Sequence, residues 1–270
     1  MKPFILAALL LPSVVLAHAD LEVQIDMVSR QIEHQPGNAA LYLRRGELHR
    51  VHREWDEAGA DFDRAEKLDS GLAVVDLARG QMLWEAGQPE AALVPLNRFL
   101  ASAPENADGH ALRARVQVAL HNPVAALTDY DAAVAGATVS AVEHYVERAR
   151  LLASLGDDRL AEAVGGLDDG LKKLGLVPAL QLTAIDLEMA RKNFDGALAR
   201  VDRLAAQMPR KESWLARRGD ILEMAGRTTE AREAYVEALA ACASLPDTRR
   251  QTPAMQELER KLREAIHAKR

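Results

Sequence analysis

The stretch Arg45–Ala65, RGELHRVHREWDEAGADFDRA, decides the fold because its pattern returns twice at a constant interval. Five of its positions are followed, 34 residues later and 34 residues later again, by residues of similar type. The five columns are Arg45, Arg79 and Arg113; Gly46, Gly80 and Ala114; Ala58, Ala92 and Ala126; Phe62, Leu96 and Tyr130; and Ala65, Phe99 and Ala133. Self-similarity at one fixed period indicates a structural unit that is repeated along the chain.

Each unit is predicted to contain two helices. Tyr42, Gly46 and His49 lie on one stripe of a first helix, because they are four and three residues apart. The matching stripe of a second helix is Ala58, Phe62 and Ala65. Small residues such as Gly46 let the two backbones approach, and Phe62 fills the space between them. The repeating unit is therefore a pair of packed helices.

These columns resemble the tetratricopeptide repeat, whose pattern runs W-x2-L-G-x2-Y, then A-x3-F, then P. The fourth copy needs about two extra residues near the turn between its helices, and the fifth has Ala184-Ile185 where others carry Arg-Gly. The six copies are 39–72, 73–106, 107–140, 142–177, 178–211 and 212–245. The resemblance implies an all-α fold, a right-handed α-solenoid of about six helix pairs.

Amphipathic segments flank the repeats and are predicted to cap the array. Residues 20–36 form an N-terminal capping helix, residues 37–252 the repeat array, and residues 253–270 a C-terminal capping helix. Such caps are expected because a solenoid otherwise exposes apolar faces at both ends.

The first residues, 1–19, are predicted to be a cleavable signal peptide. Lys2 precedes an apolar run, and Ala17-His18-Ala19 matches the A-x-A cleavage pattern, so the mature chain should begin at Asp20. The apolar run is shorter than the about 20 residues that a membrane-spanning helix needs. No cysteine follows the cleavage site to carry a lipid. We therefore expect export to the periplasm, without membrane insertion after cleavage.

Charge and cysteine content exclude several classes of protein. The net charge is −6, or −7 once Lys2 is removed, and the sequence has no dense basic run. This balance argues against nucleic acid or an anionic membrane as the main partner. Cys242 is the only cysteine, so the exported chain would have no internal disulfide.

The sequence offers no clear catalytic or metal site, and no cofactor is expected. His49 and His52 share a helical face, but no third ligand follows at metal-binding spacing, so a structural role is favoured. The segment 165–170, GGLDDG, lacks the patterns of a calcium loop and of a phosphate loop. It is interpreted as part of a helix whose glycines allow close packing.

The recurring arginine predicts ion pairs inside the repeats. Asp61 and Asp129 follow Arg45 and Arg113 by 16 residues and lie on the second helix of the same repeat. Some tetratricopeptide repeats show the same Arg-Gly pair answered by an Asp before the aromatic residue. We expect Arg45–Asp61 and Arg113–Asp129 pairs; a ligand-binding ladder of arginines is the alternative.

The resemblance also implies a concave groove, lined by first helices, that binds peptides, protein tails or helices. The candidate partner-binding residues are Leu43, Glu47, Arg50, Leu77, Gln81, Trp84, Arg115, Arg150, Asp186 and Asp220. Trp84 and Arg115 stand out, because aromatic residues and arginine dominate binding hot spots. No packing role is expected for Trp84 within its own repeat; the alternative is that a neighbouring side chain covers it.

The sequence thus predicts a non-enzymatic periplasmic scaffold that binds a protein or peptide in its groove, in the assembly of the cell envelope. Two alternatives belong to other classes. One is an accessory subunit of an enzyme, with a metal site among residues taken as packing. The other is a structural protein that associates with itself.

Overall fold

The structure is a computed structural model that describes residues 11–136 and 142–268, with side chains described from Asp20 onward. Most of the predicted signal peptide lies outside this part. The chain divides into two compact units, which we call the N-terminal unit (Met1–Gly136) and the C-terminal unit (Ala137–Arg270). Every regular element within the described ranges is helical. None of these helices has the length and apolar character that crossing a membrane requires.

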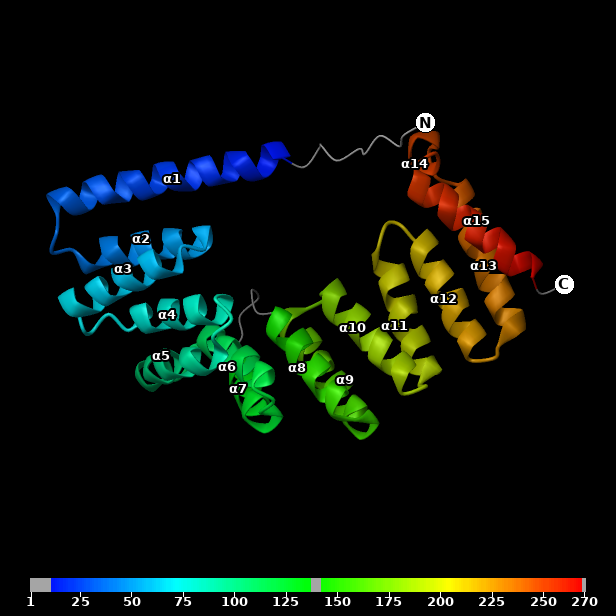
Figure 1. Ribbon diagram of the computed structural model, residues 1–270. Coiled ribbons are helices and arrows are strands. Elements are labelled where there is room, and N and C mark those ends of the chain that lie inside the picture. The colour runs from blue at the N-terminus through cyan, green and yellow to red at the C-terminus, as the bar shows by residue number, and fades with distance from the viewer. Residues whose placement is uncertain (1–10, 137–141, 269–270) are drawn as a thin grey trace, which may run out of the picture. The chain divides into compact units, whose positions relative to one another are not determined.

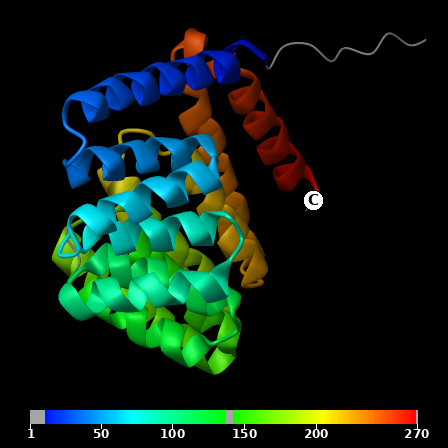
Figure 2. The ribbon, with the colours of Figure 1, turned by 60° about the vertical axis from the view of Figure 1, so that its left-hand side comes forward.

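The N-terminal unit is a capping helix followed by three helix pairs (Figures 1 and 2). Its helices are α1 (Leu11–His34), α2 (Ala39–His52), α3 (Trp55–Leu68), α4 (Val74–Glu85), α5 (Pro89–Ser102), α6 (Ala107–Ala119) and α7 (Pro123–Ala135). Each first helix packs on the second helix of its own repeat, and neighbouring first helices touch, α2 with α4 and α4 with α6.

The C-terminal unit contains three further pairs and a cap (Figure 1). Its helices are α8 (Val142–Leu155), α9 (Leu160–Leu174), α10 (Pro178–Ala190), α11 (Phe194–Gln207), α12 (Glu212–Met224), α13 (Thr228–Ala243), α14 (Asp247–Arg250) and α15 (Pro253–His267). A 3-10 turn, Asp157–Arg159, separates α8 from α9 and accommodates the extra residues that the sequence placed there. The cap α15 packs on α13 and buries Met255 and Leu262.

The column residues close the helix pairs as predicted. A Cβ added to Gly46 would lie 2.6 Å from the ring of Phe62, and one added to Gly80 would lie 2.6 Å from Leu96. Real Cβ atoms do not approach so closely, so the absent side chain sets the spacing of the two helices. Phe62 and Leu96 are fully buried at these contacts. The predicted all-α tetratricopeptide solenoid class is therefore confirmed.

The turn between the two helices of a repeat shares one backbone conformation in both units. The residue in this turn has a positive φ of 58° to 75° in five repeats. These residues are Arg53, Gly87, His121, Lys192 and Gly226. Left-handed backbone favours glycine and costs other residues about 1–2 kcal/mol, yet arginine, histidine and lysine occupy three of the five turns. The same turn conformation therefore recurs in these repeats even where the turn residue is not a glycine.

Candidate functional site

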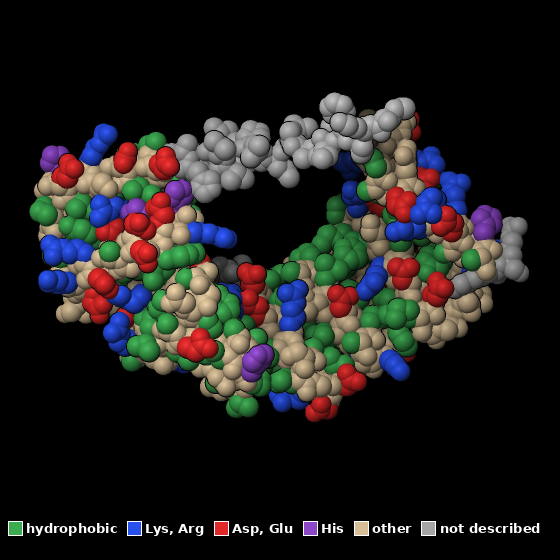
Figure 3. Space-filling view, viewed as in Figure 1, with side chains coloured by type: hydrophobic (Ala, Val, Ile, Leu, Met, Phe, Trp, Pro, Cys, Tyr) green, Lys and Arg blue, Asp and Glu red, His purple; other side chains and the backbone are tan. Residues whose placement is uncertain are grey.

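The predicted groove positions fall on first helices in both units. We call the positions on α2, α4 and α6 the N-terminal groove face; they are Leu43, Glu47, Arg50, Leu77, Gln81, Trp84 and Arg115. The positions on α8, α10 and α12 form the C-terminal groove face; they are Arg150, Asp186 and Asp220. Figure 3 shows basic and acidic side chains interspersed over the visible face of each unit.

Polar residues of the N-terminal groove face are linked to one another by ion pairs and hydrogen bonds, with Glu85 beside them as a common partner. Arg50 is 2.8 Å from Glu47 in α2 and 2.6 Å from Glu85 in α4, and Gln81 donates to Glu85 at 3.0 Å. Burial alone would lower the pKa of Arg50, but its hydrogen bonds to Glu47 and Glu85 raise that pKa above its usual value. These polar groups, which include predicted groove positions, tie α2 to α4.

Trp84 is half-buried, which corrects the expectation that it has no packing role within its own repeat. It packs against a cluster of buried residues that includes Leu96 of its own repeat and Val116 of the next. Leu77 packs against the same cluster, and Leu43 packs against the core formed by the first repeats. Arg115 of α6 is also half-buried. The aromatic face available at Trp84 is therefore only part of its ring.

The C-terminal groove face is more exposed. Arg150 of α8 is exposed and forms no ion pair with any described residue. Asp186, whose side chain is 69% exposed, pairs at 2.8 Å with Arg217, whose side chain is 41% exposed. Leu182, one turn before Asp186, has 42% of its surface exposed. Apolar and charged groups thus lie side by side on α10.

Asp220 is tied to the core of its repeat rather than being available only to solvent. The hydroxyl oxygen of Tyr235 lies 3.0 Å from Asp220 and 2.8 Å from Glu223, so the two carboxylates share its single hydrogen. Burial, followed by the hydrogen bond to Glu223 and the charge of Asp220, raises the pKa of Tyr235 well above its usual value. The hydroxyl of Tyr235 therefore serves as a fixed donor between two carboxylates.

The two histidines of the opening stretch share one carboxylate. Glu54 lies 2.6 Å from Nδ1 of His49 and 2.9 Å from Nδ1 of His52, and Asp61 lies 3.9 Å from Nε2 of His49. The hydrogen bond with His49 is the largest of the effects that lower the pKa of Glu54. Across the described residues, no group of three or more His, Cys, Asp or Glu side chains is arranged to hold a metal ion.

Cys242, the only cysteine, is fully buried in the core of the last repeat. Burial raises the pKa of its thiol, with the charges of Glu259 and Glu212 acting in the same direction. The thiolate is the nucleophilic form of cysteine. The surroundings of Cys242 therefore disfavour its reactive form.

Both predicted arginine–aspartate pairs are confirmed, and they are bidentate. Arg45 donates twice to Asp61, at 2.7 Å each, and Arg113 donates to Asp129 at 2.8 Å and 2.6 Å. Asp61 is 5% exposed and Asp129 4%. Asp129 also lies 2.9 Å from Nδ1 of His110. These are buried structural braces, as the sequence indicated.

A third contact of each arginine was not predicted. Nη1 of Arg45 donates to Ser29 at 3.0 Å, and Nη1 of Arg113 donates to Asn97 at 2.8 Å. Both acceptors lie 16 residues before the arginine, on the helix that precedes it: Ser29 on the capping helix α1 and Asn97 on the second helix α5. Each guanidinium therefore joins three successive helices. The signal was available in the spacing, but it is weak because serine and asparagine are not charged partners.

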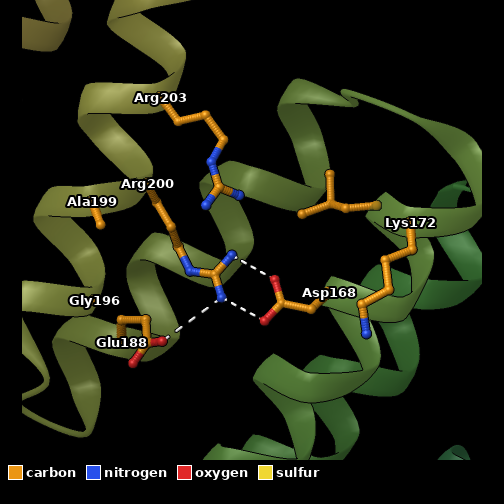
Figure 4. Close-up of a pocket in the computed structure, with 8 residues that line it drawn as sticks. Asp168, Lys172, Glu188, Gly196, Ala199, Arg200 and Arg203 are labelled. Atoms are coloured by element: carbon orange, nitrogen blue, oxygen red, sulfur yellow. Dashed lines mark hydrogen bonds and ion pairs between the residues drawn. The ribbon is translucent and has the colours of Figure 1, made fainter.

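Sequence reasoning missed Arg200, the most buried arginine described. Arg200 of α11 is 7% exposed, and its two terminal nitrogens each lie 2.8 Å from an oxygen of Asp168 in α9. It stands beside a cavity of about 530 Å³ between α9, α10 and α11 (Figure 4). The cavity is lined by Asp168, Leu171, Lys172, Glu188, Gly196, Ala199, Arg200 and Arg203.

Two family matches agree with this geometry. Residues 172–257 match a family described as a tetratricopeptide repeat-like domain, and residues 77–141 match one described as a tetratricopeptide repeat. Together these matches cover more than half of the chain. The chain belongs to the tetratricopeptide repeat family. A search of curated proteins found no match.

Solved structures share the fold at low sequence identity. The crystal structure of YrrB, described as a TPR protein with an unusual peptide-binding site, is 22% identical over 67% of this chain and 92% of its own, with a TM-score of 0.51. A tetratricopeptide repeat protein from Parabacteroides merdae is 17% identical over 92% of this chain and 94% of its own, with a TM-score of 0.52. PilF of Pseudomonas aeruginosa is 15% identical over 83% of this chain and 97% of its own, with a TM-score of 0.55. The tetratricopeptide fold is generally a non-catalytic scaffold for protein interaction.

Proposed function

We propose that this chain is a non-enzymatic scaffold that binds a protein or peptide partner along its first helices. The observation that carries the proposal is the contact between successive first helices, α2 with α4, α4 with α6, and α8 with α10. Because these helices touch, their outward positions form a continuous surface over α2, α4 and α6 in the N-terminal unit and over α8 and α10 in the C-terminal unit. YrrB, which shares the fold, is described as having a peptide-binding site.

The two groove faces suit different parts of a ligand. Beside the C-terminal groove face, Leu182 offers exposed apolar surface, and Arg150 is an exposed cation without a described ion partner. An extended segment with apolar and acidic side chains fits this chemistry. The N-terminal groove face offers part of Trp84 and the polar network around Arg50. Half-buried aromatic residues are typical of binding hot spots, and Trp84 and Arg115 remain our candidate anchors there.

We place this activity in the periplasm, in assembly of the cell envelope, on the basis of the signal-like sequence 1–19. Cleavage would remove the first residues of α1 and leave the part that packs through Val28 and Ile32. N-terminal sequencing of protein from the periplasmic fraction should begin at Asp20. A chain that retains Met1 and stays with the membrane contradicts this proposal.

A photo-crosslinking amino acid at a single position tests groove binding directly. At Leu182, which lies on α10 one turn before Asp186 of the C-terminal groove face, we expect a crosslinked product with the partner in envelope extract. Val236 is the matched control, because it is a similarly exposed apolar residue (50%, against 42% for Leu182) on a second helix of the same unit. Equal crosslinking at both positions, or crosslinking at Val236 alone, contradicts groove binding. A product of twice the mass of the chain favours self-association instead.

A further inference from the structure

The cavity between α9, α10 and α11 is separate from the groove faces, because its walls belong mainly to second helices. We propose that it binds a carboxylate carried on a short aliphatic chain, with Arg203 and Lys172 as the groups that hold the carboxylate. This site does not depend on partner binding by the first helices.

The acidic groups of the cavity are already satisfied. Asp168 receives both terminal nitrogens of Arg200 at 2.8 Å. Glu188, 5% exposed, receives a hydrogen bond from Asn193 at 2.8 Å and lies 3.7 Å from both Arg200 and Arg191. A cation entering the cavity would have to displace these arginines. The acidic groups therefore do not form a cation site.

Arg200 forms a rigid part of the wall rather than an available ligand group. Beside Asp168 and Glu188, it donates to Gln181 at 3.3 Å. Gln181 is 1% exposed. These acceptors fix and neutralise the guanidinium, so Arg200 positions the cavity wall instead of attracting an anion from solvent.

The remaining charge at the cavity is positive. Arg203 lies one turn after Arg200 on the same face of α11, and its side chain extends toward the cavity (Figure 4). Arg203 is exposed and forms no ion pair with any described residue. Lys172 lines the cavity from α9 and pairs, among the described residues, only with Asp169, at 2.8 Å, in a pair that is more than 70% exposed on both sides. Exposed pairs of this kind contribute little, so Lys172 is readily available to another anion.

The size and lining of the cavity indicate what carries the anion. Its volume of about 530 Å³ lies within the usual range for small-molecule sites. Leu171 and Ala199 add apolar surface beside the two cationic groups. A planar carboxylate matches the fork of a guanidinium, and a few methylene groups match the apolar wall. A free dicarboxylate and a glutamate side chain of a peptide both have this chemistry.

The test is a titration of the chain from Asp20 to Arg270, which is the predicted form after cleavage. The chain is labelled with nitrogen-15, and the titration is followed at the amide resonances of Gly196 and Ala199. The probes are glutarate, a capped Gly-Glu-Gly peptide whose only carboxylate is the side chain, and inorganic phosphate. We expect glutarate to shift both resonances, and Arg203→Ala to weaken its binding by at least about 10-fold. Arg203→Lys should bind with intermediate strength, because it keeps the charge but loses the fork.

Arg232→Ala is the control, since Arg232 is also an exposed arginine on a second helix without a described ion partner. Its glutarate affinity should equal that of the native chain. Binding of glutarate but not of the peptide assigns the site to a free dicarboxylate, and binding of both assigns it to an acidic side chain. Absence of any shift at millimolar glutarate, stronger binding of phosphate, or equal loss in the two alanine variants overturns the proposal.

Discussion

The bracing arginine stands on the first helix in repeats 1 and 3 of the N-terminal unit, but on the second helix in repeat 5 of the C-terminal unit. In repeats 1 and 3, arginine stands on the first helix and aspartate on the second, as in Arg113 and Asp129. In repeat 5 the arginine position of the first helix is Ala184, and Arg200 occupies the aspartate position of the second helix. Arg200 then pairs with Asp168 on the second helix of repeat 4.

The position of the arginine, on the first or on the second helix, determines how successive repeats are joined. In the N-terminal unit a first-helix guanidinium lies between two second helices and contacts both, as Arg113 contacts Asn97 and Asp129. In repeat 5 Arg200 joins the second helices α9 and α11 directly through Asp168, and it also contacts Gln181 and Glu188 of the first helix α10, where Ala184 is small and buried. The cavity lies beside this direct link. The bracing arginine of repeat 5 therefore stands on the second helix and borders a cavity.

The largest expected effect is the loss of the buried brace in repeat 3. Arg113→Ala leaves the carboxylate of Asp129, which is 4% exposed, without its bidentate partner. Removing one partner of a buried ion pair costs about 3–5 kcal/mol of unfolding free energy, because an uncompensated charge stays buried. We expect a loss in this range by chemical denaturation, and a strongly non-additive cycle with Asp129→Ala.

Arg79→Ala is the control for this cycle, because Arg79 occupies the same column of the repeat. Its partners are Asp63 and Glu66, whose side chains are 70% and 43% exposed. Repeat 2 has Pro95 where Asp129 stands in repeat 3. Breaking exposed pairs should cost about 0–1 kcal/mol. Equal losses for Arg79→Ala and Arg113→Ala contradict the distinction between buried and exposed braces.

The direct link of repeat 5 should be weaker than the buried brace. Asp168→Ala removes the bidentate acceptor of Arg200, but the Asp168 side chain is 39% exposed and water from the cavity can replace it. We expect a loss of about 1–3 kcal/mol, the usual range for a hydrogen-bonded charged group that is left partly solvated. The neighbouring Asp169→Ala should leave the melting temperature nearly unchanged, because Asp169 pairs only with the exposed Lys172. A larger loss for Asp168→Ala than for Arg113→Ala would reverse the comparison.

The sequence predicted those features that depend on a period. The 34-residue columns predicted the six helix pairs, the close approach at Gly46, and the Arg113–Asp129 pair, because equivalent positions have equivalent surroundings in a repeat. The predicted N-terminal cap is part of a longer helix, α1, which begins at Leu11 within the predicted signal peptide. The short helix α14 was not predicted, since four residues carry no periodic pattern.

Features that break the period escaped prediction. Arg200 stands where the pattern expects an acid or a small residue, and its partner Asp168 lies in the preceding repeat, so no spacing within one repeat connects them. The packing of Trp84 was predicted only as the alternative, because the buried cluster that covers part of it includes Val116 of the next repeat. Such contacts depend on how neighbouring repeats stack, which a pattern inside one repeat does not specify.

The smallest expected effect concerns the shared carboxylate of Glu54, which pairs with histidines instead of arginine. Its hydrogen bond to His49 lowers the pKa of Glu54 below the usual value of 4.5. A carboxylate whose pKa is lowered on folding stabilises the fold fully above its unfolded pKa, and this contribution is lost as the pH falls through the lowered folded pKa. The native chain should therefore exceed Glu54→Gln in unfolding free energy by at most about 1 kcal/mol above pH 4.5, because Glu54 is 38% exposed.

Denaturation at a series of acidic pH values should show this difference shrinking below pH 4.5. Glu57→Gln, at an exposed glutamate in the first turn of α3, is the control for removing a first-turn carboxylate without histidine partners, and its loss of unfolding free energy should be smaller than that of Glu54→Gln. A Glu54→Gln difference that grows on acidification contradicts a carboxylate stabilised in its charged form by the two histidines.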